Sequence, residues 1–289
     1  MEKDISVVVS VRNVERFIAK CLSSILNQTY SHFELVILDS LSTDGTVQEI
    51  KKFNDNRIRF YEINKKLGLT EARNESIKFA AGKYLFFTDG DCIVAKDWLM
   101  EGINSFRNNP DCIAVEGKTY YVSEDYKPTR SDDIVENLNG GLYHTCNIAY
   151  KKSVFQKVGF FDERFNYHED RDFAYRAAKL GKIIFNSKMV VYHQKKTIKP
   201  KDFIKTGKRL KNRVLLYKKY GENPLFMGRV AYPLNLATLL FPPLVFASFL
   251  RNRYRSKADF DLFPFIYFQI LYERLSLWEI CARERVLLI

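Results

Sequence analysis

Two carboxylates stand two positions apart at the end of an apolar stretch, in the run Asp89-Gly90-Asp91. Side chains two residues apart on an extended segment point to the same side, so both carboxylates can address one divalent cation. Gly90 between them lets the backbone approach a ligand closely. Hard oxygen ligands suit Mg²⁺ or Mn²⁺ held partly by phosphate groups of a substrate. A D-x-D run also occurs by chance in acidic loops, and this one gains weight because it directly follows a predicted strand.

The segments that must position these carboxylates alternate between strand-like and helix-like patterns. Four apolar runs rich in β-branched and aromatic residues predict strands, and apolar residues recur at helical spacing between them. The predicted strands are 5–11, 33–38, 58–63 and 83–88, and the predicted helices are 17–26, 46–53 and 70–81. This order predicts an α/β fold with a mostly parallel sheet and helices on both faces. In such sheets the ligand lies beyond the carboxyl ends of the strands.

Beyond the fourth strand the pattern is more mixed. It predicts strands at 112–116 and 147–150, and a helix over 169–180 that Gly181 ends. The acidic pair Glu169-Asp170 opens this helix. Because carboxylates are favoured at the positive end of the helix dipole, capping of the helix is one interpretation of the pair.

The composition describes a folded chain with unevenly distributed charge. The chain has 289 residues, 46% hydrophobic residues and a formal net charge of +12. Residues 1–198 carry 29 basic and 27 acidic side chains, whereas residues 199–289 carry 17 and 7. A nucleic-acid-binding protein is disfavoured, because the main segment is nearly neutral and the basic segment lacks interleaved stacking aromatics. A local contact of the C-terminal third with something anionic, such as a membrane face, fits better.

Cysteine usage and the N-terminus indicate an intracellular protein. The five cysteines are scattered, with no C-x-x-C pair and no spacing that suggests zinc, and they are Cys21, Cys92, Cys112, Cys146 and Cys281. Such a set predicts reduced thiols in the cytosol. The first apolar stretch, 5–11, is too short for a signal peptide. We therefore expect the N-terminal part to stay inside the cell.

The C-terminal third changes character. Residues 195–219 contain eleven basic side chains and one acidic side chain. Residues 230–250 carry no charge and could cross a bilayer on length alone, but prolines interrupt them, and a second apolar run, 262–272, is shorter. Flanking basic clusters favour a region, 195–289, that dips into or lies on the cytoplasmic face of the cell membrane. A proline-broken hydrophobic subdomain packed on the sheet is the alternative.

Several motifs, in chain order, resemble the family-2 glycosyltransferases of the GT-A fold. The donor-binding stretch of that family is similar to VVVSVRN at 7–13, LDSLSTDGT at 38–46 and GLTEARNESIKFAAGKYLFFTDGD at 68–91. Its acceptor-side segment is similar to NIAYKKSVFQKVGFFDERFNYHEDRDFAYRAAKLG at 147–181, in which Glu169-Asp170 stands at the ED motif. The resemblance covers about residues 4–196 and ends with His193, which matches a late histidine of the family.

This resemblance implies a domain organisation. Residues 1–198 would form a Rossmann-like GT-A catalytic domain, with a nucleotide-sugar half over about 1–118 and an acceptor half over about 119–198. For residues 199–289, beyond the resemblance, the basic and apolar composition predicts a helical, membrane-associating region.

The resemblance also implies roles for individual residues. On the donor side, Asp39 would accept a hydrogen bond from the nucleobase, and Ser10, Val11 and Asn13 would line its site. Arg73 would lie near the diphosphate, Asp89 would face the ribose, and Gly90 would belong to the donor site beside it. Asp89 and Asp91 would bind Mg²⁺ or Mn²⁺ with support from His193, and His144, Asn147 and His168 would stand on the acceptor side. Ser40 and the Val11-Arg12 pair depart from the family's pattern, which leaves the base and the sugar open.

The expected chemistry agrees with these roles. A departing nucleoside diphosphate develops negative charge, which a divalent cation and Arg73 would stabilise. An acceptor hydroxyl must lose a proton, and Asp170, paired with Glu169, is our candidate for the base. The expected activity is inverting, metal-dependent transfer of a sugar from a UDP-, GDP- or dTDP-linked donor to a hydroxyl of a lipid-linked glycan or surface-polysaccharide precursor.

Two other functions stay open. A polyprenyl-phosphate sugar synthase would have an acceptor that is already anionic and would need no base. A non-catalytic sugar-nucleotide or glycan-binding subunit would retain the fold without the reaction. The sequence does not decide whether the chain forms a homo-oligomer.

Several assignments also have a structural alternative. Asp39 could be a turn residue, Arg73 a solvated helix residue and His193 a hydrogen-bonded histidine beside the sheet. Cys92, next to the acidic pair, is interpreted as a packing residue.

Overall fold

A computed structural model describes residues 3–123, 136–165, 167–194, 200–221, 226–227, 230–231 and 263–286. The chain forms two compact units. The first unit comprises Met1–Phe165 and Glu169–Lys195, and the second comprises Asn166–His168 and Lys196–Ile289.

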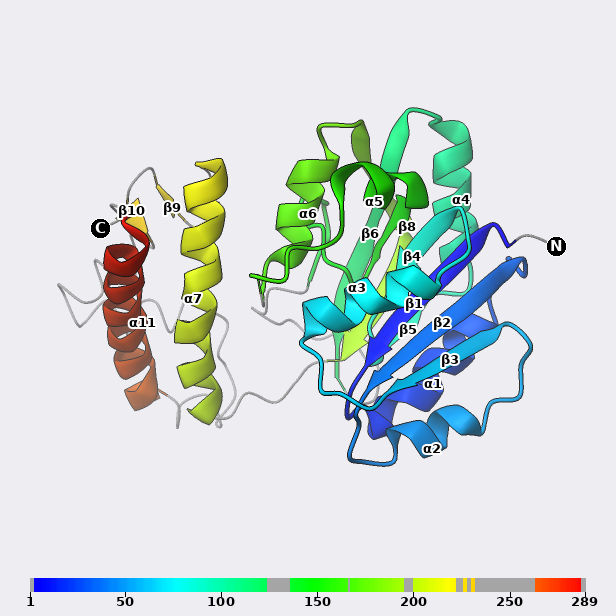
Figure 1. The fold of residues 1–289 in the computed structure, drawn as a ribbon, viewed down its shortest axis with the longest axis horizontal. Helices are drawn as coiled ribbons and strands as arrows, with labels where there is room; N and C mark the ends of the chain where they lie inside the picture. Colours follow the sequence, from blue (N-terminus) through cyan, green and yellow to red (C-terminus); the bar gives the residue numbers. More distant parts are fainter. Residues whose placement is uncertain are drawn as a thin grey trace. The chain divides into compact units, whose positions relative to one another are not determined.

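The first unit is built on an eight-stranded sheet with the order β3-β2-β1-β4-β7-β6-β8-β5 (Figure 1). Its strands are β1 (Ile5–Val11), β2 (Phe33–Ser40), β3 (Ile58–Ile63), β4 (Tyr84–Phe87), β5 (Cys92–Val94), β6 (Cys112–Val122), β7 (Ile148–Lys151) and β8 (Lys182–Gln194). The first four strands are parallel, as the sequence predicts. The pairs β4–β7, β6–β7 and β5–β8 are antiparallel, whereas β6–β8 is parallel, so the sheet as a whole is mixed.

Helices cover both faces of this sheet, which confirms the predicted layered α/β architecture (Figure 1). The helices are α1 (Glu15–Leu26), α2 (Thr46–Lys51), α3 (Leu69–Phe79), α4 (Trp98–Asn108), α5 (Lys152–Val158) and α6 (Glu169–Ala177). Alternate residues of β1 enter different cores, because side chains on a strand alternate between faces. Val7 packs in the core that contains α1 and α4, and Val8 packs in the core that contains α3, α5 and α6.

The sequence patterns did not reveal β5, α4, α5 or β8. The strand β5 has three residues, which is too short for any periodicity to show. The strand β8 is long but half-exposed over its first part, so its sequence lacks a continuous apolar run. These two strands matter for the site, because β5 pairs with β8 and sets Cys92 opposite His193.

The second unit contains two long helices, α7 (Pro200–Tyr220) and α11 (Phe263–Glu284), and a small antiparallel pair, β9 (Phe226–Met227) and β10 (Val230–Ala231). Its core contains Leu210, Val214, Leu277 and Cys281. The helix α11 continues well beyond the apolar run predicted at 262–272. Most of the uncharged stretch 230–250 lies outside the described residues.

Within the described part of the chain, we find no helix with both the length and the apolar character that a bilayer crossing requires.

Candidate active site at the carboxyl ends of the strands

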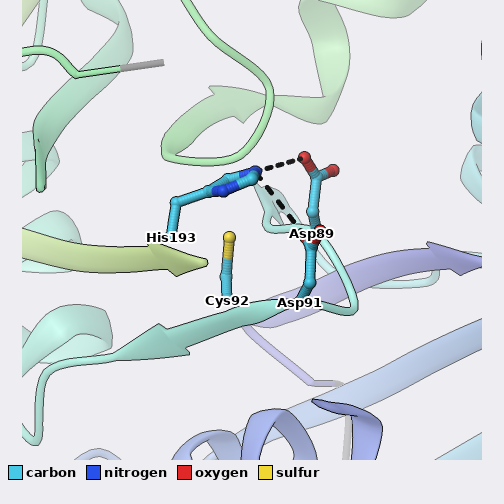
Figure 2. Close-up of side chains that lie close together, drawn as sticks. All are labelled: Asp89, Asp91, Cys92 and His193. Atoms are coloured by element: carbon cyan, nitrogen blue, oxygen red, sulfur yellow. Dashed lines mark ion pairs between the residues drawn. The ribbon is translucent and has the colours of Figure 1, made fainter. Parts of the chain in front are cut away.

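The acidic pair predicted from the sequence lies beside a histidine and a cysteine. Asp89 and Asp91 follow β4, Cys92 begins β5, and His193 lies opposite Cys92 on β8 (Figure 2). One potential ligand atom from each of these four side chains lies within 4.8 Å of all the others. The Nε2 atom of His193 is 3.7 Å from Oδ2 of Asp89 and 3.6 Å from Oδ1 of Asp91. Two segments distant in sequence, 89–92 and the end of β8 with His193, thus converge on one point.

This donor set fits a divalent cation. Two carboxylates and an imidazole are ligands that Mn²⁺ accepts, and Mg²⁺ accepts the carboxylates. The two neighbouring carboxylates also favour positive charge at the site. Burial lowers the pKa of His193, but the nearby carboxylates of Asp89 and Asp91 raise it to about 10. Asp89, Asp91 and His193 would hold the ion, as the family resemblance implies.

Gly90 is required by close packing rather than by its backbone angles. A Cβ atom at this position would lie 2.7 Å from Cγ1 of Val11 and 3.2 Å from Cγ2 of Val14. Real Cβ atoms do not come as close as 2.7 Å to another carbon, so a larger residue fits only if the Val11 side chain moves. The acidic loop therefore packs directly on the end of β1, where the sequence places part of the donor site.

Arg73 connects the two acidic motifs. Its Nη1 donates a hydrogen bond to Oε1 of Glu169 over 2.6 Å, and its Nη2 lies 3.7 Å from Oδ1 of Asp89. The guanidinium also lies 5.6 Å from the ring centroid of Phe161. Arg73 is only 4% exposed, so it is not the solvated helix residue that was one of its interpretations.

The pair Glu169-Asp170 begins α6 beside Arg73. Burial raises the pKa of Asp170 to about 6, with Asp89 adding to the rise, against the hydrogen bond from the Arg171 backbone and the charge of Arg73. Burial and the charge of Asp170 also raise the pKa of Glu169, while Arg73 opposes that rise. Oδ1 of Asp170 accepts the backbone N–H of Arg171 over 2.7 Å, so the carboxylate also binds the first turn of its helix.

The residues predicted at the nucleobase lie in or beside two loops, one after β1 and one after β2, that form hydrogen bonds with each other. Asp39 at the end of β2 accepts hydrogen bonds from the backbone N–H of Ser42, over 2.9 Å, and from the Ser42 hydroxyl. The backbone N–H of Asn13 donates to Oγ of Ser42, and Oδ1 of Asn13 accepts from the backbone N–H of Thr43. These bonds agree with the interpretation of Asp39 as a turn residue, and its contact with a base stays a prediction.

Ser10 lies one residue before the end of β1 and its hydroxyl is 2.9 Å from the hydroxyl of Ser76 on α3. The two hydroxyls share a hydrogen bond. Ser10, Val11, Asn13 and Asp39 all stand at the carboxyl ends of the neighbouring parallel strands β1 and β2. The structure therefore gathers the predicted donor residues at one edge of the sheet.

The predicted acceptor-side residues are spread more widely. The carboxamide of Asn147 is buried, and it accepts from Nε1 of Trp98 and donates to the carbonyl oxygens of Lys118 and Met189. Its polar atoms are thus used inside the protein. His144 is half-buried just before it. His168 belongs to the second unit, where its Nε2 lies 3.4 Å from Nε of Arg213.

Sequence reasoning missed a buried carboxylate that shapes the loop before His144. Glu116 on β6 is 2% exposed and accepts the backbone N–H groups of Gly141, Leu142 and Tyr143, together with Nδ2 of Asn137. The loop needs left-handed backbone angles at both glycines of the 140–141 pair. That Gly-Gly pair is the signal that could have pointed to an ordered turn here.

Solved structures with a similar fold carry nucleotide-sugar donors. A mannosyltransferase from Pyrobaculum calidifontis, solved with GDP-Man and Mn²⁺, has a TM-score of 0.64 and 17% sequence identity, and the match covers 97% of this chain and 87% of that one. The S. aureus protein TarS, residues 1–349, solved with UDP-GlcNAc, has a TM-score of 0.58 and 18% identity over 98% of this chain and 92% of that one. At this level of identity the likeness shows the fold.

Curated relatives are more similar in sequence. The glycosyltransferase GlyA of Streptococcus pneumoniae is 30% identical over 177 residues, which are 60% of this chain and 23% of that protein. The Escherichia coli protein WfaP, a UDP-Glc:α-D-GlcNAc-diphosphoundecaprenol β-1,3-glucosyltransferase, is 28% identical over 171 residues, 59% of this chain and 67% of that protein. The chain thus spans about a quarter of the first relative and about two thirds of the second.

The family model described as Glycosyl transferase family 2 matches residues 6–169, which contain the acidic loop, Arg73 and the Glu169 that it binds. This match covers more than half of the chain. The chain therefore belongs to glycosyl transferase family 2 and has the GT-A fold.

Proposed function

We propose that the protein is an inverting, metal-dependent glycosyltransferase that moves a sugar from a nucleotide-sugar donor to a hydroxyl of a lipid-linked glycan or surface-polysaccharide precursor. The observation that carries this proposal is the contact of Arg73 with both Glu169 and Asp89. It places the carboxylate cluster suited to a cation next to the carboxyl group suited to accept a proton. Inverting transfer needs these two elements on opposite sides of one reacting carbon.

On the donor side, the chain supplies charge and shape. The ends of β1 and β2 would hold the nucleoside, and Gly90 would let the acidic loop pack against β1 beside it. A bound divalent cation would supply positive charge to the leaving diphosphate. Arg73 is paired with carboxylates, so we assign it chiefly to holding Asp89 and Glu169 in place.

On the acceptor side, Asp170 would take the proton of the attacking hydroxyl. A base works best when its pKa lies near the working pH, and the raised pKa of about 6 for Asp170 meets this condition. A polyprenyl-phosphate acceptor would not need such a base. The raised pKa therefore favours a hydroxyl acceptor.

We propose further that the second unit brings the enzyme to the cytoplasmic face of the cell membrane. Four large side chains on α11, namely Phe268, Tyr272, Leu275 and Trp278, are exposed at spacings of three or four residues, which places them along one side of a helix. Aromatic residues suit the membrane interface, and the eleven basic residues of 195–219 suit anionic lipid. Localisation would raise the effective concentration of a lipid-linked acceptor.

The transfer reaction is tested with the full chain, a panel of UDP-, GDP- and dTDP-sugars, and a lipid-linked glycan acceptor, with Mn²⁺, with Mg²⁺ or with EDTA. We expect one donor to be consumed only with metal, and NMR of the product to show the opposite anomeric configuration. Asp170→Asn should lose transfer yet keep donor binding, whereas Asp111→Asn, an exposed carboxylate, should behave as wild type. Donor binding without transfer or hydrolysis under every condition would instead support a binding subunit.

The membrane contact is tested separately by sedimentation with vesicles. Anionic vesicles should bind the protein more strongly than neutral vesicles, and 0.5 M salt should weaken the binding. Equal binding to both vesicle types, or none, would contradict the proposed contact.

A further inference from the structure

A soft ligand lies inside a site otherwise suited to hard cations. Cys92 pairs in register with His193 across the antiparallel strands β5 and β8. Directly opposite residues in such a pair project to the same face of the sheet. The Cys92 sulfur points toward the His193 ring, and it lies within 4.8 Å of the ligand atoms of Asp89, Asp91 and His193 (Figure 2). Cys92 is fully buried, and its thiol also forms a hydrogen bond with the Cys146 thiol, so the sulfur lies between this neighbour and the three other potential ligands.

The spacing suits a four-coordinate ion bound by protein groups alone. Bonds of about 2.3 Å to sulfur and about 2.0–2.2 Å to nitrogen and oxygen place neighbouring ligands of a tetrahedral Zn²⁺ roughly 3.3–3.8 Å apart. Nε2 of His193 already lies 3.6 Å and 3.7 Å from the two carboxylates. No pair in the set is more than 4.8 Å apart, so side-chain movements of about 1 Å complete the shell.

The identity of the metal decides which ligands are used. Mg²⁺ and Mn²⁺ prefer oxygen and keep positions open for water or phosphate, whereas a thiolate selects Zn²⁺ and similar cations. A site with four protein ligands leaves no position for a substrate, which is the general difference between structural and catalytic zinc sites. Cys92 therefore gives this site a second way to coordinate a metal ion, with a thiolate ligand that hard cations do not use.

We propose that Asp89, Asp91, Cys92 and His193 form a closed site for Zn²⁺ and other thiophilic divalent cations, in which the Cys92 thiolate completes a shell of four protein ligands and leaves the metal no coordination position for the donor diphosphate. The sulfur–metal bond forms as the thiol proton passes to solvent, and no oxidant or reductant takes part. The expected consequence, inhibition of transfer, rests on the proposed function. The coordination itself does not.

Cobalt reports thiolate ligation directly, because Co²⁺ bound to a thiolate shows charge-transfer absorption in the near ultraviolet. We expect this band when the full chain is titrated with Co²⁺, and we expect Cys92→Ser to lose it. Zn²⁺ affinity should fall at least about tenfold more than Mn²⁺ affinity in the same variant, since even outer-shell changes cost about 10- to 100-fold. Cys112→Ser, a buried thiol outside the set, should keep the band.

The wild-type protein provides a test that does not depend on how a variant folds. Zinc-edge X-ray absorption should show one sulfur at about 2.3 Å from the bound ion. A zinc shell without sulfur, or a cobalt band that survives Cys92→Ser, would overturn the proposal.

Transfer assays separate this proposal from the proposed function. We expect Zn²⁺ to inhibit Mn²⁺-supported transfer in competition with Mn²⁺. If sulfur is found in the zinc shell but no sugar is transferred with Mn²⁺, the proposed function is wrong and the proposed zinc site still stands. If sugar is transferred with Mn²⁺ but zinc has no sulfur ligand, the proposed closed site is wrong and the proposed function still stands. The same holds if transfer is as fast with Zn²⁺ as with Mn²⁺.

Discussion

Arg73 and Glu169 are joined by a buried ion pair, with Nη1 of the guanidinium 2.6 Å from Oε1 of the carboxylate. The two residues are 96 positions apart in the sequence. Arg73 comes from α3, in the half predicted to bind the nucleotide, and Glu169 begins α6, in the half predicted to face the acceptor. Because Arg73 also lies 3.7 Å from Asp89, this pair fixes the distance between the proposed cation site and the proposed base.

The first prediction concerns the stability of this pair. Arg73→Met should lower the free energy of unfolding by about 3–5 kcal/mol, because it leaves the Glu169 carboxylate buried without its partner. The double variant Arg73→Met/Glu169→Gln should lose less free energy of unfolding than the sum of the losses in the two single variants. Urea unfolding at pH 7 measures all three. Glu75→Gln, which breaks an exposed pair with Lys78, should cost less than about 1 kcal/mol, and strictly additive losses in the buried pair would contradict coupling.

The second prediction concerns the pH dependence of transfer. Asp170 accepts a proton only when it is ionised, so kcat/KM should fall about tenfold per pH unit below a midpoint near pH 6. A bound cation adds positive charge and moves this midpoint to lower pH. Initial rates at subsaturating acceptor between pH 4.5 and 8 measure the profile. A profile that is flat across this range would remove Asp170 from the role of base.

The third prediction concerns stability and pH. The folded pKa of Asp170, about 6, lies above its ordinary value of 3.8, so the native state holds this proton more tightly than the unfolded state. The associated stability is fully present below about pH 4 and is lost as the pH rises through about 6. The free energy of unfolding of metal-free Asp170→Asn, taken relative to that of wild type at the same pH, should therefore rise by up to about 3 kcal/mol between pH 4 and pH 7.

Urea unfolding at these two pH values, with EDTA present, measures that change. Asp111→Asn should show no comparable gain, because Asp111 is exposed. An equal gain in both variants would show that the pH effect does not come from the site.

The fourth prediction concerns the cation. Mn²⁺ at 100 times its dissociation constant should stabilise the folded protein by about 2.7 kcal/mol, and EDTA should reverse the effect. Asp91→Asn should abolish most of this stabilisation, since Asp91 is one of the two carboxylates beside His193. Asp97→Asn, which changes an exposed carboxylate outside the cluster, provides the control. Thermal unfolding with and without Mn²⁺ checks the result, and equal shifts in both variants would place the ion elsewhere.

The fifth prediction separates a structural role for Asn147 from an acceptor-binding role. Asn147→Ala removes one hydrogen-bond partner from each of three groups, namely the buried Trp98 Nε1, the buried Met189 carbonyl oxygen and the part-buried Lys118 carbonyl oxygen. It should lower the free energy of unfolding by about 3 kcal/mol or more, while the acceptor KM of the folded enzyme stays unchanged. A raised acceptor KM with wild-type stability would restore the acceptor-side interpretation.

Local patterns predicted the first half of the fold well. The strands at Ile5–Val11 and Ile58–Ile63 end where the sequence places them, because polar residues border each segment and β-branched or aromatic residues dominate it. The later strands were harder to predict. Cys92–Val94 and Lys182–Gln194 pair with each other across about 100 residues, and long-range pairing leaves no period in either segment alone.

The sequence by itself determined the chemical groups of the site: the D-x-D carboxylates after a strand, the Glu169-Asp170 pair at the start of a helix, and a late histidine. Spacing within one element is a local property, so it can be read from the chain. Only the tertiary structure decided that Arg73 binds Glu169, that Cys92 lies among the potential metal ligands, and that the Asn147 carboxamide is used inside the protein. Each of these depends on which elements pack together, and burial then sets the charge and pKa that make the groups useful.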